Sequence, residues 1–118
     1  MFQGYLISFE IDGTMEFGDP PGPIAVEMVL RAKSLGCIIG SASDRTVRNQ
    51  SELWERHGVE VDFVSLKHRL TEIVERFSPE RCIHIGDTEG DKYFAGLAGF
   101  DFHFVDALPD EGSPGWIF

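Results

Sequence analysis

Five short apolar segments alternate with four amphipathic segments along this chain of 118 residues, and the alternation predicts an α/β protein. The first segment, at 5–11, is almost continuously apolar and rich in β-branched or aromatic residues, which is typical of a strand buried on both faces. The segment at 66–77 instead repeats its apolar residues at helical spacing. We therefore expect a three-layer α/β/α sandwich around a central, parallel five-stranded sheet.

The same patterns place each element along the chain. We predict strands at 5–11, 37–40, 61–65, 82–85 and 102–105. We predict helices at 23–35, 66–77 and 89–98, and a further helix between a cap at Ser43 or Asp44 and a stop at Gly58. The chain is expected to be one domain, 1–118, with its core at about 5–106 and a C-terminal surface tail at 107–118 that Trp116 and Phe118 pack down.

The chain is strongly acidic, with 20 Asp and Glu against 10 Lys and Arg and a net charge of −10. Such a surface repels nucleic acid and anionic membranes, so we expect neither as a partner. It also repels phosphorylated ligands unless a cation lies at their site; the alternative is that the charge serves only solubility. The first residues lack the basic flank of a signal peptide, and no apolar run reaches transmembrane length, so we expect a cytoplasmic protein.

Cysteine and histidine give little indication of chemistry. Cys37 and Cys82 each stand at the head of a predicted strand, and we expect buried, reduced thiols, although the sequence leaves a disulfide between them open. The four histidines show no ligand spacing. His84 lies inside the fourth predicted strand and is expected to be a packed or hydrogen-bonded residue rather than a catalyst.

Polar side chains gather where the predicted strands end, which is the edge at which parallel sheets bind ligands. The first strand leads into Glu10 and Asp12, two carboxylates that point the same way along an extended chain, and then into the turn Gly13-Thr14. The second strand leads into Gly-Ser-Ala-Ser-Asp. Its hydroxyl and backbone N–H groups suit an anion, or they simply cap the next helix.

Two further groups follow the third and fourth predicted strands. Lys67 begins a helix, where a cation opposes the helix dipole at a cost of about 0.3–1 kcal/mol. A bound phosphate would offset that cost, and a solvated surface lysine is the alternative. Asp87 and Asp91 stand four residues apart across a strand-to-helix turn, an oxygen-rich arrangement that suits Mg²⁺, although each alone could serve the helix start.

With its acidic pair, hydroxyl, lysine and second acidic pair in this order, the sequence resembles the haloacid-dehalogenase (HAD) superfamily. The family's first motif, Asp-x-Asp-Gly-Thr, is matched by 10–14, and its second by Ser41. Its third is matched by Lys67 and its fourth, Gly-Asp-x-x-x-Asp, by 86–91. The resemblance covers about 5–106 and implies a Rossmann-like core.

The resemblance implies a Mg²⁺-dependent phosphomonoesterase. The carboxylate at position 10 would attack phosphorus, and Asp12 would protonate the leaving group and then activate water. The phosphate oxygens would meet Ser41, Ala42, Lys67, Gly13 and Thr14. Mg²⁺ would bind Glu10, Asp87, Asp91 and the backbone carbonyl of Asp12.

Position 10 departs from the family, which has its nucleophilic Asp where this chain has Glu10. The extra methylene carries the carboxylate oxygens roughly 1.5 Å further from the backbone, and a misplacement of about 1 Å costs about 10²-fold in rate. We therefore expect weak or impaired phosphatase activity. The alternative is a catalytically inactive HAD-like module that binds metal, phosphate or another protein.

The spacing of the motifs leaves no room for a cap domain, because only 15–22 follow the first motif, and one helix and one strand fill the interval between the second and third. An open site excludes water poorly. It suits a large phosphorylated ligand, or closure by another copy in a homo-oligomer. Receiver domains also combine a parallel sheet with an acidic pocket and a lysine, but their lysine follows the fifth strand, where this chain has none.

Overall fold

The structure is a computed structural model that describes residues 2–110 and 113. Within these residues, five parallel strands form one sheet in the order β3-β2-β1-β4-β5. The strands are β1 (Tyr5–Phe9), β2 (Ile38–Ser43), β3 (Phe63–Leu66), β4 (Arg81–Gly86) and β5 (Asp101–Phe104). The helices are α1 (Val26–Ser34), α2 (Val47–Arg56), α3 (Leu70–Phe77) and α4 (Glu89–Leu97), with 3-10 turns at η1 (Lys67–Arg69) and η2 (Val105–Ala107). The predicted fold class is confirmed.

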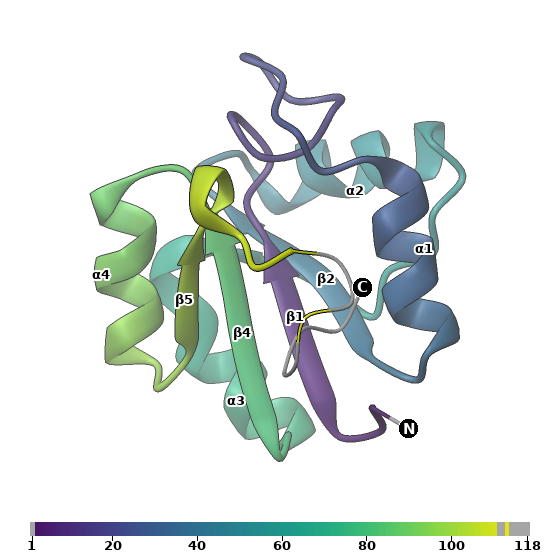
Figure 1. Ribbon diagram of the computed structural model, residues 1–118. Coiled ribbons are helices and arrows are strands. Elements are labelled where there is room, and N and C mark those ends of the chain that lie inside the picture. Colours follow the sequence, from purple (N-terminus) through teal and green to yellow (C-terminus); the bar gives the residue numbers. More distant parts are fainter. Residues whose placement is uncertain (1, 111–112, 114–118) are drawn as a thin grey trace.

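Helices cover both faces of the sheet (Figure 1). Val29 of α1 and Trp54 of α2 pack with Ile7 on one face, and Ala95 of α4 packs with Leu6 on the other. The chain runs outward from β1 to β3 and then returns to β4 on the far side of β1. Right-handed crossovers therefore place α1 and α2 on one face and α3 and α4 on the opposite face.

The strand order reverses at β1, which lies between β2 and β4. In open parallel sheets, ligands bind in the crevice outside the carboxyl ends of the strands at such a reversal. Figure 1 shows the loop between β1 and α1 standing above this edge of the sheet. The fold therefore brings the ends of β1, β2 and β4 to the expected place for a site.

The loop between β1 and α1 closes tightly on itself. The backbone N–H of Ile24 donates to the carbonyl oxygen of Thr14 at 2.9 Å. A Cβ atom at Gly22 would lie 2.4 Å from the Thr14 backbone, so a side chain has no room there. The ring of Phe17 stands edge-on to the indole of Trp54, with centroids 5.1 Å apart, and anchors the loop on α2.

Several element boundaries differ from those predicted, and three of the differences are the largest. β2 continues from Gly40 to Ser43 because these residues pair with β3. α1 begins at Val26 rather than at 23, because Ala25 is still extended, with a ψ of 152°. The predicted helix at 66–77 is divided into η1 and α3, since Arg69 between them has a ψ of 20°. The first difference matters most, because it moves the tip of β2 toward the site.

The described part of the C-terminal tail packs on the body of the protein. Leu108 of the tail, and Val105 just before the tail, contact the core on the face that carries α1 and α2. Trp116 and Phe118 lie outside the described residues. Cys37 and Cys82 are free thiols. None of the described helices combines the length and the apolar character needed to cross a membrane.

Candidate functional site

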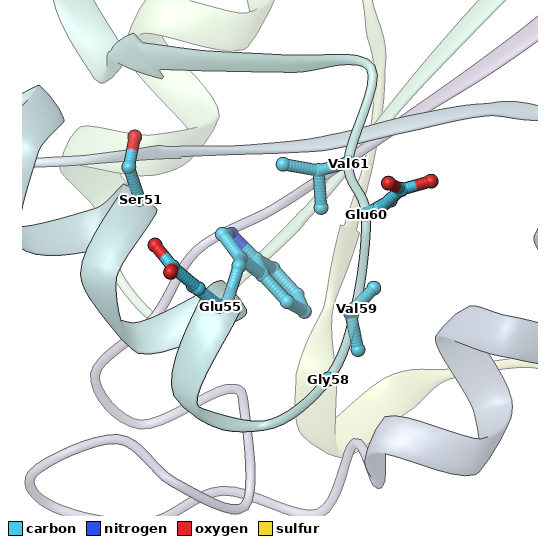
Figure 2. Close-up of a pocket in the computed structure, with 7 residues that line it drawn as sticks. Ser51, Glu55, Gly58, Val59, Glu60 and Val61 are labelled. Carbon is cyan, nitrogen blue, oxygen red and sulfur yellow. The ribbon is translucent and has the colours of Figure 1, made fainter.

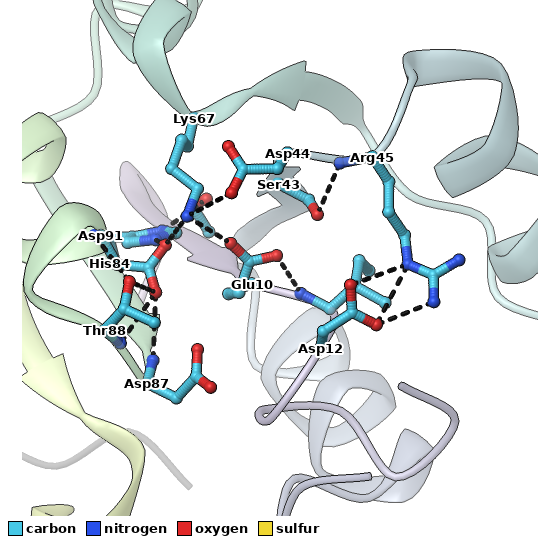
Figure 3. Close-up of polar contacts among 12 residues, drawn as sticks. Glu10, Asp12, Ser43, Asp44, Arg45, Lys67, His84, Asp87, Thr88 and Asp91 are labelled. Atoms are coloured by element: carbon cyan, nitrogen blue, oxygen red, sulfur yellow. Dashed lines mark hydrogen bonds and ion pairs between the residues drawn. The ribbon is translucent and has the colours of Figure 1, made fainter. Parts of the chain in front are cut away.

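Three acidic side chains meet on the ammonium group of Lys67, at the carboxyl edge of the sheet. Its Nζ lies 3.2 Å from Oε2 of Glu10, 3.1 Å from Oδ2 of Asp44 and 2.9 Å from Oδ1 of Asp91. Figure 3 shows the three carboxylates arranged around Lys67. These acids follow β1, follow β2 and lie in the first turn of α4, so the predicted convergence of separate strand ends occurs.

The Lys67 cluster, which consists of Lys67, Glu10, Asp44 and Asp91, is buried except at Asp44. The side chains of Lys67, Glu10 and Asp91 are 8%, 5% and 0% exposed, whereas that of Asp44 is 84% exposed. Burial alone would lower the pKa of Lys67, but Asp91 and Glu10 outweigh it and hold that pKa above its usual range. Lys67 is therefore a permanently charged centre rather than a proton donor.

Glu10 is folded back toward its own backbone. Its Oε1 accepts a hydrogen bond from the N–H of Ile11 at 2.7 Å, while Oε2 faces Lys67. Burial raises the pKa of Glu10 to about 7, and Asp91 acts in the same direction, whereas a hydrogen bond with Ser43 opposes the shift. Glu10 thus gains or loses its proton near neutral pH rather than at its usual, more acidic pKa.

Asp91 has both carboxylate oxygens engaged by the protein. Oδ2 accepts hydrogen bonds from the backbone N–H groups of Asp87 and Thr88, each at 3.1 Å, and from the Thr88 hydroxyl at 2.9 Å. Burial alone would raise the pKa of Asp91, but His84, Glu10 and Lys67 together hold it well below its usual range. Asp91 thus joins the start of α4 to Lys67 instead of presenting a free oxygen to a metal ion.

Asp87 reaches across to the loop that follows β1. A Cβ atom built at Gly13 would lie only 1.9 Å from Oδ2 of Asp87, so the carboxylate occupies the space that any side chain at 13 would need. Gly13 also has a φ of +72°, which glycine adopts without strain. Burial raises the pKa of Asp87, and repulsion by Asp91 adds to this shift. The two acidic motifs are therefore in contact.

Asp12 is held by an arginine that the motifs did not include. Nε of Arg45 lies 3.1 and 3.0 Å from the two oxygens of Asp12, and Nη2 lies 2.8 Å from Oδ1 (Figure 3). The N–H of Asp19 donates to the same Oδ1 at 2.8 Å. Partial burial would raise the pKa of Asp12, but Arg45 and Asp19 outweigh it and lower that pKa. Asp12 is thus a poor proton donor near neutral pH.

Ser41 does not reach the site, which corrects its predicted role in phosphate binding. Its hydroxyl is fully buried, donates to Oε1 of Gln50 at 2.7 Å and accepts from Nε1 of Trp54 at 2.9 Å. Ala42 is also fully buried and packs in the core of the other face. Because β2 runs on to Ser43, it is the Ser43 hydroxyl that lowers the pKa of Glu10, and it also accepts from the N–H of Arg45 at 3.1 Å.

The other predicted anion ligands are used within their own loops. The N–H of Gly13 donates to the carbonyl of Pro20 at 2.6 Å, and the N–H of Thr14 donates to that of Ile11 at 3.2 Å. The Thr14 hydroxyl is buried, with no partner among the described residues. The cap of α2 is Thr46, which accepts from the N–H of Asn49, so Ser43 and Asp44 are not needed as caps.

Replacing the two serines separately distinguishes their roles. Ser41→Ala is expected to lower the free energy of unfolding by about 1–3 kcal/mol, because the buried side chains of Gln50 and Trp54 each lose a hydrogen-bond partner. Ser43→Ala is expected to cost less stability and to weaken the binding of inorganic phosphate. Urea unfolding and a calorimetric phosphate titration measure both effects. Weaker phosphate binding in Ser41→Ala alone would restore the original assignment.

The charges in the site are unbalanced. The acids outnumber the bases: Glu10, Asp12, Asp44, Asp87 and Asp91 face Lys67 and Arg45. Among the described residues, no three His, Cys, Asp or Glu side chains are already arranged to hold a metal ion. The surplus of hard oxygen ligands nevertheless suits Mg²⁺.

Two pockets lie in very different relations to this site. One of about 350 Å³ is lined by Asp87 and by residues 104–106, at the carboxyl ends of β4 and β5. Another, of about 310 Å³, is lined by Ser51, Trp54, Glu55 and residues 58–61 (Figure 2). The second lies where the chain enters β3, at the amino edge of the sheet. Its lining contains two glutamates and no cation, so it is not suited to a phosphate.

No protein family model, no curated protein and no solved structure matches this chain.

Proposed function

We propose that this chain is a HAD-like domain that binds Mg²⁺ and a phosphate group and hydrolyses phosphomonoesters weakly. The observation that supports this function is the meeting of Glu10, Asp44 and Asp91 on the buried ammonium of Lys67. Asp12 and Asp87 flank the same place. A buried cation beside surplus carboxylates is the arrangement needed to hold a phosphate against a divalent ion.

Each group has a role in this proposal. Glu10, Asp87 and the backbone carbonyl of Asp12 hold Mg²⁺, which supplies charge to offset that of the phosphate oxygens. Lys67 and the Ser43 hydroxyl bind those oxygens. Asp91 keeps Lys67 in place through its 2.9 Å ion pair. The original assignment of Asp91 as a metal ligand and of Ser41 as a phosphate ligand is not retained.

Two contacts argue that turnover is slow. Glu10 directs Oε1 to the N–H of Ile11 rather than outward, and its longer side chain displaces the attacking oxygen. Arg45 lowers the pKa of Asp12, which weakens Asp12 as a general acid toward the leaving group. The same contacts favour the alternative function, a catalytically inactive module that keeps metal and phosphate binding.

The uncovered site indicates the size of the ligand that it can accept. Between β1 and α1 the chain forms one loop, 10–25, that packs on α2 through Phe17, and within the described residues no cap domain covers the carboxyl edge. We expect a phosphorylated substrate in the cytoplasm, including one of macromolecular size. Closure by a second copy of the chain is the alternative route to a protected site.

Magnesium binding is the primary test of this function. Mg²⁺ is expected to raise the melting temperature of the wild-type protein, because binding to the native state adds about 2.7 kcal/mol at a concentration 100 times the Kd. Asp87→Asn is expected to abolish the response. Asp110→Asn, which removes an exposed acid outside the site, controls for charge. Equal responses of wild type and Asp87→Asn, or none in either, would contradict the proposal.

A further inference from the structure

His84 is a fully buried polar residue that none of the four motifs contains. It lies in β4, opposite Ser8 of β1 in the sheet register. Its Nδ1 is 2.9 Å from the Ser8 hydroxyl, and its Nε2 is 3.7 Å from Oδ1 of Asp91. Among the described residues, Nε2 has no hydrogen-bond partner. The ring thus connects the interior of the sheet to the acid that holds Lys67.

The neighbours of His84 determine where its ring carries hydrogen. The Asp91 carboxylate only accepts hydrogen bonds, and it is fully buried beside Nε2. A bare Nε2 there would bring two acceptors together without water, which is costly. Nε2 therefore carries a hydrogen directed at Asp91, and in the neutral ring Nδ1 accepts from the Ser8 hydroxyl.

Ser8, His84 and Asp91 are the residue types of a hydrolase triad, but this arrangement cannot act as one. A triad serine must reach substrate, whereas Ser8 is 0% exposed inside the sheet. The role left for His84 is orientation of its neighbours. Outer residues that orient ligands commonly change metal affinity or activity 10–100-fold when replaced.

We propose that His84 is a positioning residue, whose Nε2–H fixes the Asp91 carboxylate so that Asp91 fixes the Lys67 ammonium beside Glu10. Oδ2 of Asp91 is already held by the start of α4, so His84 and Lys67 share Oδ1. The effect on phosphate binding rests on the proposed function. The contact chain itself belongs to the metal-free protein and is testable without it.

Two amide variants separate the two ring nitrogens. The side-chain N–H of glutamine reaches the position of Nε2, so His84→Gln keeps a donor toward Asp91. The shorter asparagine reaches only the position of Nδ1, so His84→Asn keeps the contact with Ser8 and loses the one with Asp91. Both bury one amide in place of one ring, and Ile83→Val serves as a core variant of β4 with the polar chain intact.

Lysine labelling reports how accessible the Lys67 amine is in the metal-free protein. An amine-reactive ester modifies Lys67 slowly while its ammonium is buried in three ion pairs, and the exposed Lys92 provides an internal reference. We expect His84→Asn to raise the Lys67/Lys92 labelling ratio several-fold, and His84→Gln and Ile83→Val to leave it near that of wild type. Equal ratios in all four proteins, or equal increases in both His84 variants, would overturn the proposal.

Nitrogen-15 NMR of wild type provides a test that needs no variant to fold. The His84 spectrum should show a protonated Nε2, and a bare Nε2 would overturn the proposal. In a separate experiment, Mg²⁺ affinity in the presence of inorganic phosphate should fall about tenfold in His84→Asn and recover in His84→Gln. If wild type binds neither ligand, the proposed function fails, while labelling and NMR still decide the role of His84.

Discussion

Lys67→Met is expected to lower the free energy of unfolding of the metal-free protein by about 3–5 kcal/mol near neutral pH. Methionine matches the length of the side chain but leaves the buried carboxylates of Glu10 and Asp91 without their cation. The loss should shrink as the pH falls toward about 7 and change little below it. Burial already raises the pKa of Glu10 to about 7 in wild type, so at lower pH both proteins carry a proton on Glu10 and differ only at Asp91.

The sign of this pH dependence follows from proton binding. Lys67→Met raises the folded-state pKa of Glu10 further above the wild-type value of about 7, so above that pH the folded variant binds more protons than folded wild type and the difference in stability narrows as the pH drops. Urea unfolding at several pH values measures the effect. Lys92→Met, at an exposed position, is the control, and Glu10→Gln combined with Lys67→Met should recover part of the loss. A loss of under about 1 kcal/mol would mean that the cluster is solvated like a surface ion pair.

Glu10→Asp is expected to raise phosphate release from an aryl phosphate in Mg²⁺ by about 10²-fold. Shortening the side chain removes the methylene that lets Oε1 fold back onto the N–H of Ile11. The carboxylate would then lie closer to the β1 backbone, as the proposed HAD-like chemistry requires. The initial rate of phosphate release, compared with that of wild type, measures the gain.

The gain must depend on the site and not on a contaminant. Glu10→Asp combined with Asp87→Asn should fall to background, and Glu10→Gln should show no gain. Robust wild-type turnover that Glu10→Asp does not increase would defeat our interpretation of Glu10. An inactive Glu10→Asp variant that still binds Mg²⁺ would indicate that Asp12, and not Glu10, limits the rate of phosphate release. Arg45 holds Asp12 through three hydrogen bonds.

The fold followed from the sequence because its signals are local. Each strand is a short apolar run, and each helix repeats its apolar residues with helical spacing, so the order of elements was readable along the chain. The length of β2 was not readable in this way. Ser41, Ala42 and Ser43 look like a polar turn, and their pairing with β3, together with that of Ser41 with β1, makes them a strand. The choice between two serines depended on that tertiary contact.

The composition of the site was only partly predictable. Glu10, Lys67, Asp87 and Asp91 were identified by their places after strands, and the structure brings them together. Arg45 was missed, although a cation immediately after a strand that ends in the site is a usable signal. Its direction toward Asp12 depends on the path of two loops, which no local pattern encodes. Gln50, a fully buried amide in α2, was likewise hidden by an otherwise polar helix.

The position of Trp54 gives the protein an intrinsic optical reporter. Its indole N–H donates a hydrogen bond to the Ser41 hydroxyl in β2. The ring of Phe17, from the loop that also carries Asp12, packs edge-on against the indole ring. Indole emission responds to its immediate surroundings, so a ligand that shifts that loop should change the fluorescence without any attached dye. The only other tryptophan is Trp116, and a Trp116→Phe background would leave a single emitter.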